Sequence, residues 1–151
     1  MKKILSCFCI LVLMLTLVGC NSSGQKELTN HAKYDSFELI LQDAIIEEMN
    51  DGTKIVKIKA EYTNSSEESQ YAYSSFVVKA FQNDKELKDL SDINGNQSSL
   101  IQETKNKAKV SVSYVFELND ESPVEVLIGE PTADQTTIGQ KTYFKNENID
   151  D

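Results

Sequence analysis

The chain has few of the residues from which most catalytic and metal sites are built. It has no tryptophan, no arginine, one histidine and three cysteines, and Cys7, Cys9 and Cys20 all lie among the first 20 of its 151 residues. After Cys20 no thiol remains, which excludes a disulfide, a zinc–cysteine site and thiol catalysis in that part. His31 lies in a polar stretch before the first predicted strand. We therefore expect no functional role for it and no Ser-His-Asp or Cys-His site, and we predict a protein that is not an enzyme and needs no cofactor.

Positive charge is also scarce. The sequence has 15 lysines against 24 acidic residues, a net charge of −9. Without Lys2 and Lys3, which belong to a predicted signal peptide, 13 lysines oppose the same 24 acids and the net charge becomes −11. Such a surface repels phosphates, so we expect no nucleic-acid partner. The acids leave a carboxylate-based hydrolase open, but nothing in their pattern singles out a pair.

The N-terminus has the layout of an export signal. Lys2 and Lys3 precede the uncharged apolar run from Ile4 to Val18, which is shorter than the roughly 20 residues of a membrane-spanning helix. Leu17-Val18-Gly19-Cys20 then resembles the lipobox of bacterial prolipoproteins at every position. The resemblance implies diacylglyceryl transfer to the Cys20 thiol, cleavage after Gly19 and anchoring on the extracytoplasmic face of the cell membrane. The alternative is a plain signal peptide that happens to contain a cysteine.

Composition divides the chain into four parts. We predict a signal peptide over 1–19, a lipidated cysteine and flexible tether over 20–33, one β-domain over 34–145 and a disordered acidic tail over 146–151. A polar tether of this length has a root-mean-square span of ~20 Å, which would keep the domain close to the membrane. We expect the domain to be a monomer.

Two segments alternate strictly between apolar and polar residues, as half-buried strands do. In Val110–Leu118 the even-numbered positions are apolar, and in Lys54–Thr63 the residues Val56, Ile58, Ala60 and Tyr62 are predicted to face inward. The remaining strands are weaker predictions, as are the turns at 50–52 and 83–84. They cover 37–47 with a bulge or break near Gln42-Asp43, 71–82, 85–87, 124–128 and 141–145, the last with Tyr143 or Phe144 inward. The pattern predicts an all-β, immunoglobulin-like antiparallel sandwich of about seven strands.

Three local motifs support this fold. Tyr62-Thr-Asn-Ser-Ser-Glu-Glu68, the hairpin 76–87 and Leu118-Asn119-Asp120 resemble uncharacterised Gram-positive lipoprotein domains with a telokin-like, immunoglobulin-type sandwich. The resemblance covers roughly residues 37–128. It departs at Asn106-Lys107-Ala108, where such domains often carry Pro-Gly. Because the motifs are turns and strand ends, they imply a fold and a non-catalytic surface domain without a defined chemistry.

Two further features are candidates for a site. Asp92, Asn94, Asn96 and Glu103 match positions 1, 3, 5 and 12 of an EF-hand loop, but Gln97 stands where that loop needs glycine, so we predict an ordinary loop and no metal. Tyr71, Tyr73 and Phe76 form an aromatic cluster that suits either a recognition surface or strand packing.

The function favoured by these observations is a lipid-anchored module that binds an unknown protein, peptide or cell-wall ligand. The alternative is an immunity lipoprotein that captures cationic antimicrobial peptides, because a charge of −11 held near the membrane raises their local concentration.

Overall fold

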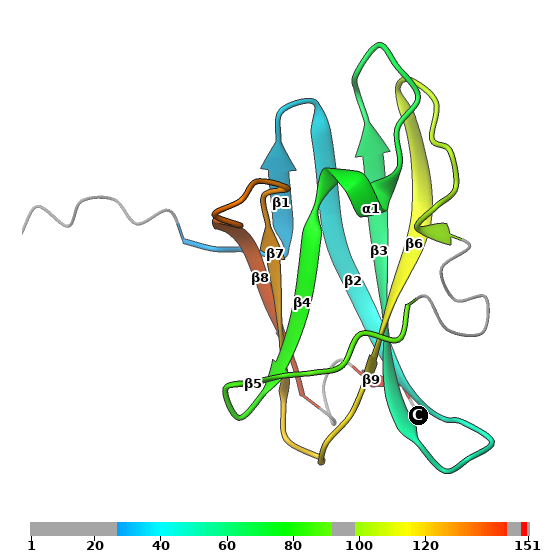
Figure 1. Cartoon of the computed structure of the whole chain (residues 1–151), viewed down its shortest axis with the longest axis vertical. Helices are drawn as coiled ribbons and strands as arrows, with labels where there is room; N and C mark the ends of the chain where they lie inside the picture. The colour runs from blue at the N-terminus through cyan, green and yellow to red at the C-terminus, as the bar shows by residue number, and fades with distance from the viewer. Residues whose placement is uncertain (1–26, 92–98, 145–148, 151) are drawn as a thin grey trace, which may run out of the picture.

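A computed structural model describes residues 27–91, 99–144 and 149–150 as two antiparallel sheets packed face to face (Figure 1). The all-β sandwich predicted from the sequence is therefore confirmed. Several predictions fall outside the described residues: the signal peptide, the lipobox with Cys20, positions 92–98 of the EF-hand-like loop and most of the acidic tail. Within the described residues no helix has both the length and the hydropathy needed to cross a membrane.

The first sheet has the order β1-β2-β3-β6. Its strands are β1 (His31–Tyr34), β2 (Phe37–Glu48), β3 (Lys54–Asn64) and β6 (Ala108–Glu117). The two-residue β9 (Ile149–Asp150) pairs in parallel with Ala44 and Ile45 of β2. Because β3 occupies the opposite side of β2 along its length, β9 lies on the same side of β2 as β1.

The second sheet has the order β5-β4-β7-β8. Its strands are β4 (Val77–Gln82), β5 (Lys85–Glu86), β7 (Val124–Gly129) and β8 (Thr137–Tyr143). A single helical turn, α1 (Ala72–Ser75), carries the chain from β3 towards β4. The chain crosses from the first sheet to the second before β4, returns for β6 and crosses again before β7, so both sheets are built from distant parts of the sequence.

The core lies between the sheets, and its residues follow the predicted alternation. Val56, Ile58, Ala60 and Tyr62 of β3 are fully buried, and they face Val112, Tyr114 and Phe116 of β6 across the pairs 56–116, 58–114 and 60–112. The second sheet contributes Ala80, Val124, Val126, Ile128 and Tyr143 to the same cluster. The longer strands therefore bury one face, as the period of two requires.

A smaller apolar cluster lies on the outer face of the first sheet. After β5 the chain returns along β6, where the Leu90 N–H donates to the Val115 C=O at 2.8 Å. Leu90 then packs on Ile55 and Val115, which point away from the main core. These two buried residues are the exceptions to the alternation, and the returning segment explains them.

The irregularity predicted near Gln42-Asp43 is a β-bulge inside one continuous strand. The register of β2 against β3 shifts between Leu41 and Ala44, so Leu39, Leu41 and Ala44 all face the core. The bulge also turns the Gln42 carbonyl towards the second sheet, where it accepts hydrogen bonds from the Tyr143 hydroxyl at 2.9 Å and from the Lys141 ammonium. It therefore ties the two sheets together.

Four features differ from the sequence-based expectations. The sheet starts at His31, within the predicted tether, because His31–Tyr34 pairs with Phe37–Ile40. The strand predicted from Tyr71 begins at Val77, and α1 precedes it. The last strand of the second sheet begins at Thr137, four residues earlier than expected, and Ile149–Asp150 of the predicted disordered tail forms β9. Three of these segments form strands by pairing with β2 or β7, and α1 is instead held by the burial of Ala72 and Ser75.

Candidate functional site

One side of the sandwich is closed by a close approach of the two sheets. The Gln140 N–H on β8 donates to the Thr29 C=O just before β1, at 2.8 Å. Gly139 allows this approach, because a Cβ atom there would lie 3.0 Å from the Ile128 side chain, 3.1 Å from the Ala32 side chain and 3.2 Å from the Thr29 C=O. Small residues on both strands thus bring β1 and β8 together.

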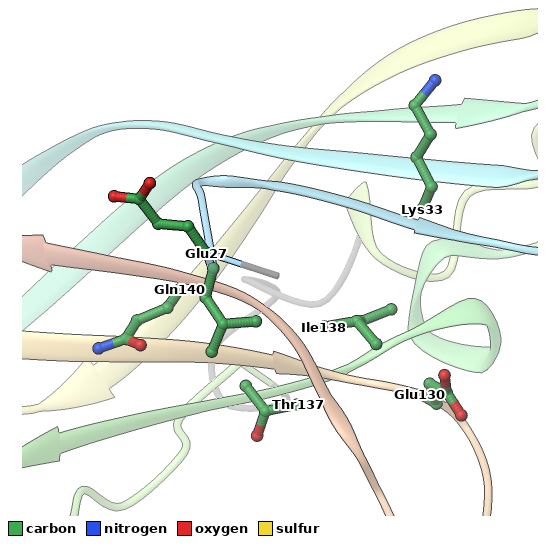
Figure 2. A pocket seen from close by; sticks show the side chains of 7 residues that line it. Glu27, Lys33, Glu130, Thr137, Ile138 and Gln140 are labelled. Carbon is green, nitrogen blue, oxygen red and sulfur yellow. The ribbon is translucent and has the colours of Figure 1, made fainter. Parts of the chain in front are cut away.

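Beside this contact lies an open groove of about 800 Å³ (Figure 2). Its lining comes from the segment that leads into β1, from β1 itself, from the β7–β8 loop and from β8: Glu27, Leu28, Lys33, Glu130, Thr137, Ile138 and Gln140. In Figure 2 Glu27 lies close to Gln140 at one end, Glu130 lies at the other, and Thr137 and Ile138 lie between them. The groove therefore has one apolar and one hydroxyl side chain between two acidic ones.

The charges around the groove differ in whether they are already paired. Lys33 donates to Glu38 at 2.7 Å, and His31 lies 3.2 Å from the same carboxylate. The hydrogen bond from Lys33, with that from His31, holds the pKa of the Glu38 carboxyl below its usual range. In the part of the chain that the structure describes, Glu27 and Glu130 form no ion pair. The groove therefore presents two uncompensated negative charges, while its one cation is neutralised by a neighbour.

His31 does not lie in a tether, as the sequence suggested. It belongs to β1 and its ring contacts Glu38 of β2. Among the described residues no hydroxyl is bonded to the His31 ring, and Glu38 is also bound by Lys33. The arrangement is a surface ion-pair cluster on the outer face of the first sheet.

Two residues in the motifs that resemble the lipoprotein family, Asn64 and Gln82, hold neighbouring loops in place by hydrogen bonds. Asn64 is fully buried, and its amide donates to the carbonyls of Glu68 and Thr104 while its oxygen accepts from Ser66. Its role is thus to hold the β3 end against the chain entering β6.

Gln82 acts in the same way at the opposite end of the sandwich. Its buried amide donates to the carbonyls of Asp120 and Ser122 and accepts from the Asn119 N–H. The hydrogen bonds that Asp120 accepts from Ser122 lower the pKa of its carboxyl. These turn residues therefore stabilise the fold, and Asn64 and Gln82 do not line the groove.

The aromatic cluster divides into a buried and an exposed part. Phe76 is buried and meets Tyr62 edge-on, with ring centroids 6.4 Å apart. Tyr71 and Tyr73 are 37% and 55% exposed and pack against each other with centroids 5.8 Å apart. Of the three aromatic residues only these two tyrosines are accessible to a partner; Tyr73 lies in α1 and Tyr71 directly precedes it, and neither lines the groove.

The EF-hand-like loop lies mostly outside the described residues. Of its four ligand positions only Glu103 is described, and its side chain is exposed. Among residues 27–91, 99–144 and 149–150 no three His, Cys, Asp or Glu side chains are grouped so that they could hold a metal ion.

The groove is not apparent from the sequence. Its residues come from 27–33 and 130–140, which the sequence placed in a tether and in a loop before the last strand. The one local signal was Gly139 among β-forming residues, a position where a close approach of another backbone is a common reason for glycine.

Comparison with known proteins places this chain in a family. Residues 21–128 match the family described as Domain of unknown function (DUF5067). The chain belongs to this family. No curated protein matches it. The matched range contains both braced loops and the strands from β1 to β6, whereas β8, with its part of the groove, lies outside it.

Two solved structures share the fold at low sequence identity. One is a putative lipoprotein from Staphylococcus aureus subsp. aureus NCTC 8325, with a TM-score of 0.61 and 14% identity, and the match covers 80% of this chain and 91% of that chain. The other is the putative lipoprotein ycdA from Bacillus subtilis subsp. subtilis str. 168, with a TM-score of 0.55 and 11% identity, covering 80% of this chain and 40% of that one. At such identities the likeness concerns the fold.

Proposed function

We propose that this protein is a non-catalytic binding module with an immunoglobulin-type, telokin-like sandwich, anchored by lipid on Cys20 to the extracytoplasmic face of the cell membrane. The observation that carries the binding role is the open groove between the segment entering β1 and strand β8. The lipobox Leu17–Cys20 supports the anchor, as does the likeness in fold to two proteins described as putative lipoproteins.

The position of the groove suits a protein that acts close to a membrane. Glu27 lines the groove and follows Cys20 by seven residues, a length of chain that spans at most about 25 Å when fully extended. A ligand in the groove is then held near the bilayer. This proximity is the advantage that an anchor gives a binding module.

The anchor is tested by substituting Cys20→Ser in cells fed a labelled fatty acid. We expect the wild-type protein to carry label and to sediment with membranes, and the variant to lose both. The matched control is Cys9→Ser, which removes a thiol inside the predicted signal peptide and leaves the lipobox intact. Labelling and membrane retention that survive Cys20→Ser would overturn the anchor.

A more specific candidate is an immunity protein that captures cationic antimicrobial peptides. The two unpaired carboxylates of the groove, Glu27 and Glu130, favour it, together with the net charge of −11 that the chain would carry without residues 1–19. Deletion of the gene should sensitise the cell to such a peptide, and the Cys20→Ser protein should restore resistance poorly because it is no longer held near the membrane. Equal rescue by anchored and unanchored protein would contradict this role.

A further inference from the structure

We infer that an exposed patch beside α1, formed by Tyr71, Tyr73 and Ile101 with Glu103 at its edge, binds a lysine or arginine side chain of a peptide partner. We call it the tyrosine patch. The inference rests on the proposed binding function, and it gives the module a contact surface apart from the groove.

The first argument is that exposed apolar side chains gather at this place. Five large apolar side chains are exposed among the described residues, and Tyr71, Tyr73 and Ile101 are three of them. The other two, Leu28 and Phe144, lie at the groove and after β8. The two tyrosine rings contact each other with their planes tilted by 39°. Single exposed apolar residues are normal on a protein surface, whereas a group of them marks an interaction site.

The backbone places Tyr71 opposite Glu103. Gln70 and Thr104 exchange two hydrogen bonds of 3.0 and 2.8 Å and form an antiparallel bridge. Tyr71 has an extended backbone, so in this register it faces Glu103, the residue before Thr104. Successive side chains on extended chain point to opposite faces. Because Thr104 is buried, Tyr71 and Glu103 share the exposed face.

Hydrogen bonds also fix the rest of the tyrosine patch. The Tyr73 N–H donates to the Leu100 C=O at 3.4 Å, which brings the next residue, Ile101, close to Tyr73. The buried Ser75 hydroxyl donates to the Tyr71 C=O at 3.0 Å. The backbone under the patch is therefore already ordered, so a partner loses little free energy in fixing it.

The Asn64 brace supports the same surface. The buried Asn64 amide donates to the Thr104 C=O at 2.8 Å and so holds the segment that carries Glu103. All residues of the tyrosine patch lie within 21–128, the range that matches the family. The groove, by contrast, depends on β8 outside that range.

The second argument is charge complementarity. The segments 65–75 and 99–105 carry three carboxylates against the single ammonium of Lys105. The carboxylates are those of Glu67, Glu68 and Glu103. Within the described residues none of the three forms an ion pair. A basic side chain can lay its apolar stem on Ile101 and place its charge over a tyrosine ring beside Glu103.

The test measures binding of fluorescein-labelled Gly-Lys-Ser-Lys-Ser-Lys-Gly to the full-length lipidated protein by fluorescence anisotropy. An uncharged detergent is used, because its head group cannot occupy a cation site. We expect saturable binding that weakens about tenfold in the double variant Tyr71→Ser, Tyr73→Ser. The double variant Tyr71→Phe, Tyr73→Phe keeps both rings and should bind within about threefold of the wild type. The peptide with norleucine in place of lysine keeps the apolar stems without the charge and should not bind.

Matched variants separate the patch from the overall negative charge. Phe144→Ser removes an exposed ring elsewhere and should change the affinity by less than about twofold, because no cation–π contact is lost there. Glu103→Gln should weaken binding about threefold, the effect of one exposed ion pair. Glu47→Gln removes the same charge at an exposed position of β2 and should leave the affinity unchanged.

The outcomes distinguish the patch from the proposed function. Equal affinities of the wild type and the Tyr71→Ser, Tyr73→Ser protein would overturn the patch, and so would equal binding of the norleucine peptide. If binding is lost instead in Glu27→Gln, Glu130→Gln, the groove binds the peptide: the proposed binding function then stands and the tyrosine patch does not. Absence of binding up to millimolar peptide would overturn the inference, while lipid labelling and membrane retention of the same preparation would show that the anchor holds.

Discussion

Two buried tyrosines on neighbouring strands differ in one hydrogen bond, which makes them a matched pair for mutation. Tyr62 on β3 places its hydroxyl 2.7 Å from the Ser75 hydroxyl on α1. The hydroxyl of Tyr114 on β6 is buried and has no hydrogen-bond partner within the described residues. Burial raises the pKa of both side chains, and in Tyr62 the Ser75 hydrogen bond opposes this rise.

The substitution Tyr→Phe should therefore have opposite effects at the two positions. A buried polar group without a partner costs ~1–3 kcal/mol, and phenylalanine keeps the ring while removing that group. We expect Tyr114→Phe to raise the free energy of unfolding by about 1 kcal/mol. Tyr62→Phe should lower it by about 1 kcal/mol, the net value of one hydrogen bond, because Ser75 still donates to the Tyr71 C=O.

Urea denaturation followed by circular dichroism measures both effects on protein that lacks residues 1–20. With a slope of roughly 2 kcal/mol per molar urea, the midpoint should rise by about 0.5 M for Tyr114→Phe and fall by about 0.5 M for Tyr62→Phe, with unchanged slopes. A loss of stability in Tyr114→Phe as large as that in Tyr62→Phe would refute the reasoning, since it would mean that the Tyr114 hydroxyl is satisfied.

Three further outcomes follow from the same structure. Gly139→Ala should lower the free energy of unfolding by about 1–3 kcal/mol, because the added methyl group would be forced against Ala32 and the Thr29 carbonyl. The control Thr142→Ala, on the outer face, should cost less than about 0.5 kcal/mol. Equal melting temperatures for the two variants would contradict the close approach. Asn64→Ala should cost about 2–4 kcal/mol in thermal unfolding, since it removes the hydrogen bonds that the fully buried amide makes to Glu68, Thr104 and Ser66. A shift no larger than that of exposed Ser65→Ala would show that the brace is dispensable. The free energy of unfolding should also fall as the pH rises above about 10, because burial raises the pKa of Tyr114 in the folded state and the unfolded chain therefore loses this proton first. In urea titrations at alkaline pH the fall should be shallower for Tyr114→Phe. The same fall in both proteins would argue against the burial of this hydroxyl.

Much of the architecture can be predicted from local patterns. The alternation in Lys54–Thr63 and Val110–Leu118 predicts the two central strands and their buried faces, because a period of two places every second side chain in the core. Turn chemistry predicts the hairpins as well: Gly52 adopts a φ of 83°, and Asn83 and Asp84 adopt φ values of 49° and 61°. The phase change in β2 predicts the bulge.

The sequence is less informative where a segment is short and its conformation depends on packing. His31–Tyr34 is too short to show a period, and it becomes a strand because β2 offers an edge beside it. The sequence predicts one strand over 71–82, but the chain forms the turn α1 at its start, with Ala72 and Ser75 buried and Ser75 bonded to Tyr62. Burial of particular atoms, rather than propensity, decides these cases.

The sequence by itself determined the class of this protein: a predicted export signal ending in Cys20, an acidic and thiol-free chain after it, and two alternating segments that could only be half-buried strands. The groove was decided by tertiary structure alone. Its walls lie about a hundred residues apart in the chain, and they meet because Gly139 and Ala32 are small enough for β8 and the entry to β1 to touch. A period of two tells which side of a strand is buried, but the strand that comes to lie beside its edge depends on how the two sheets pack.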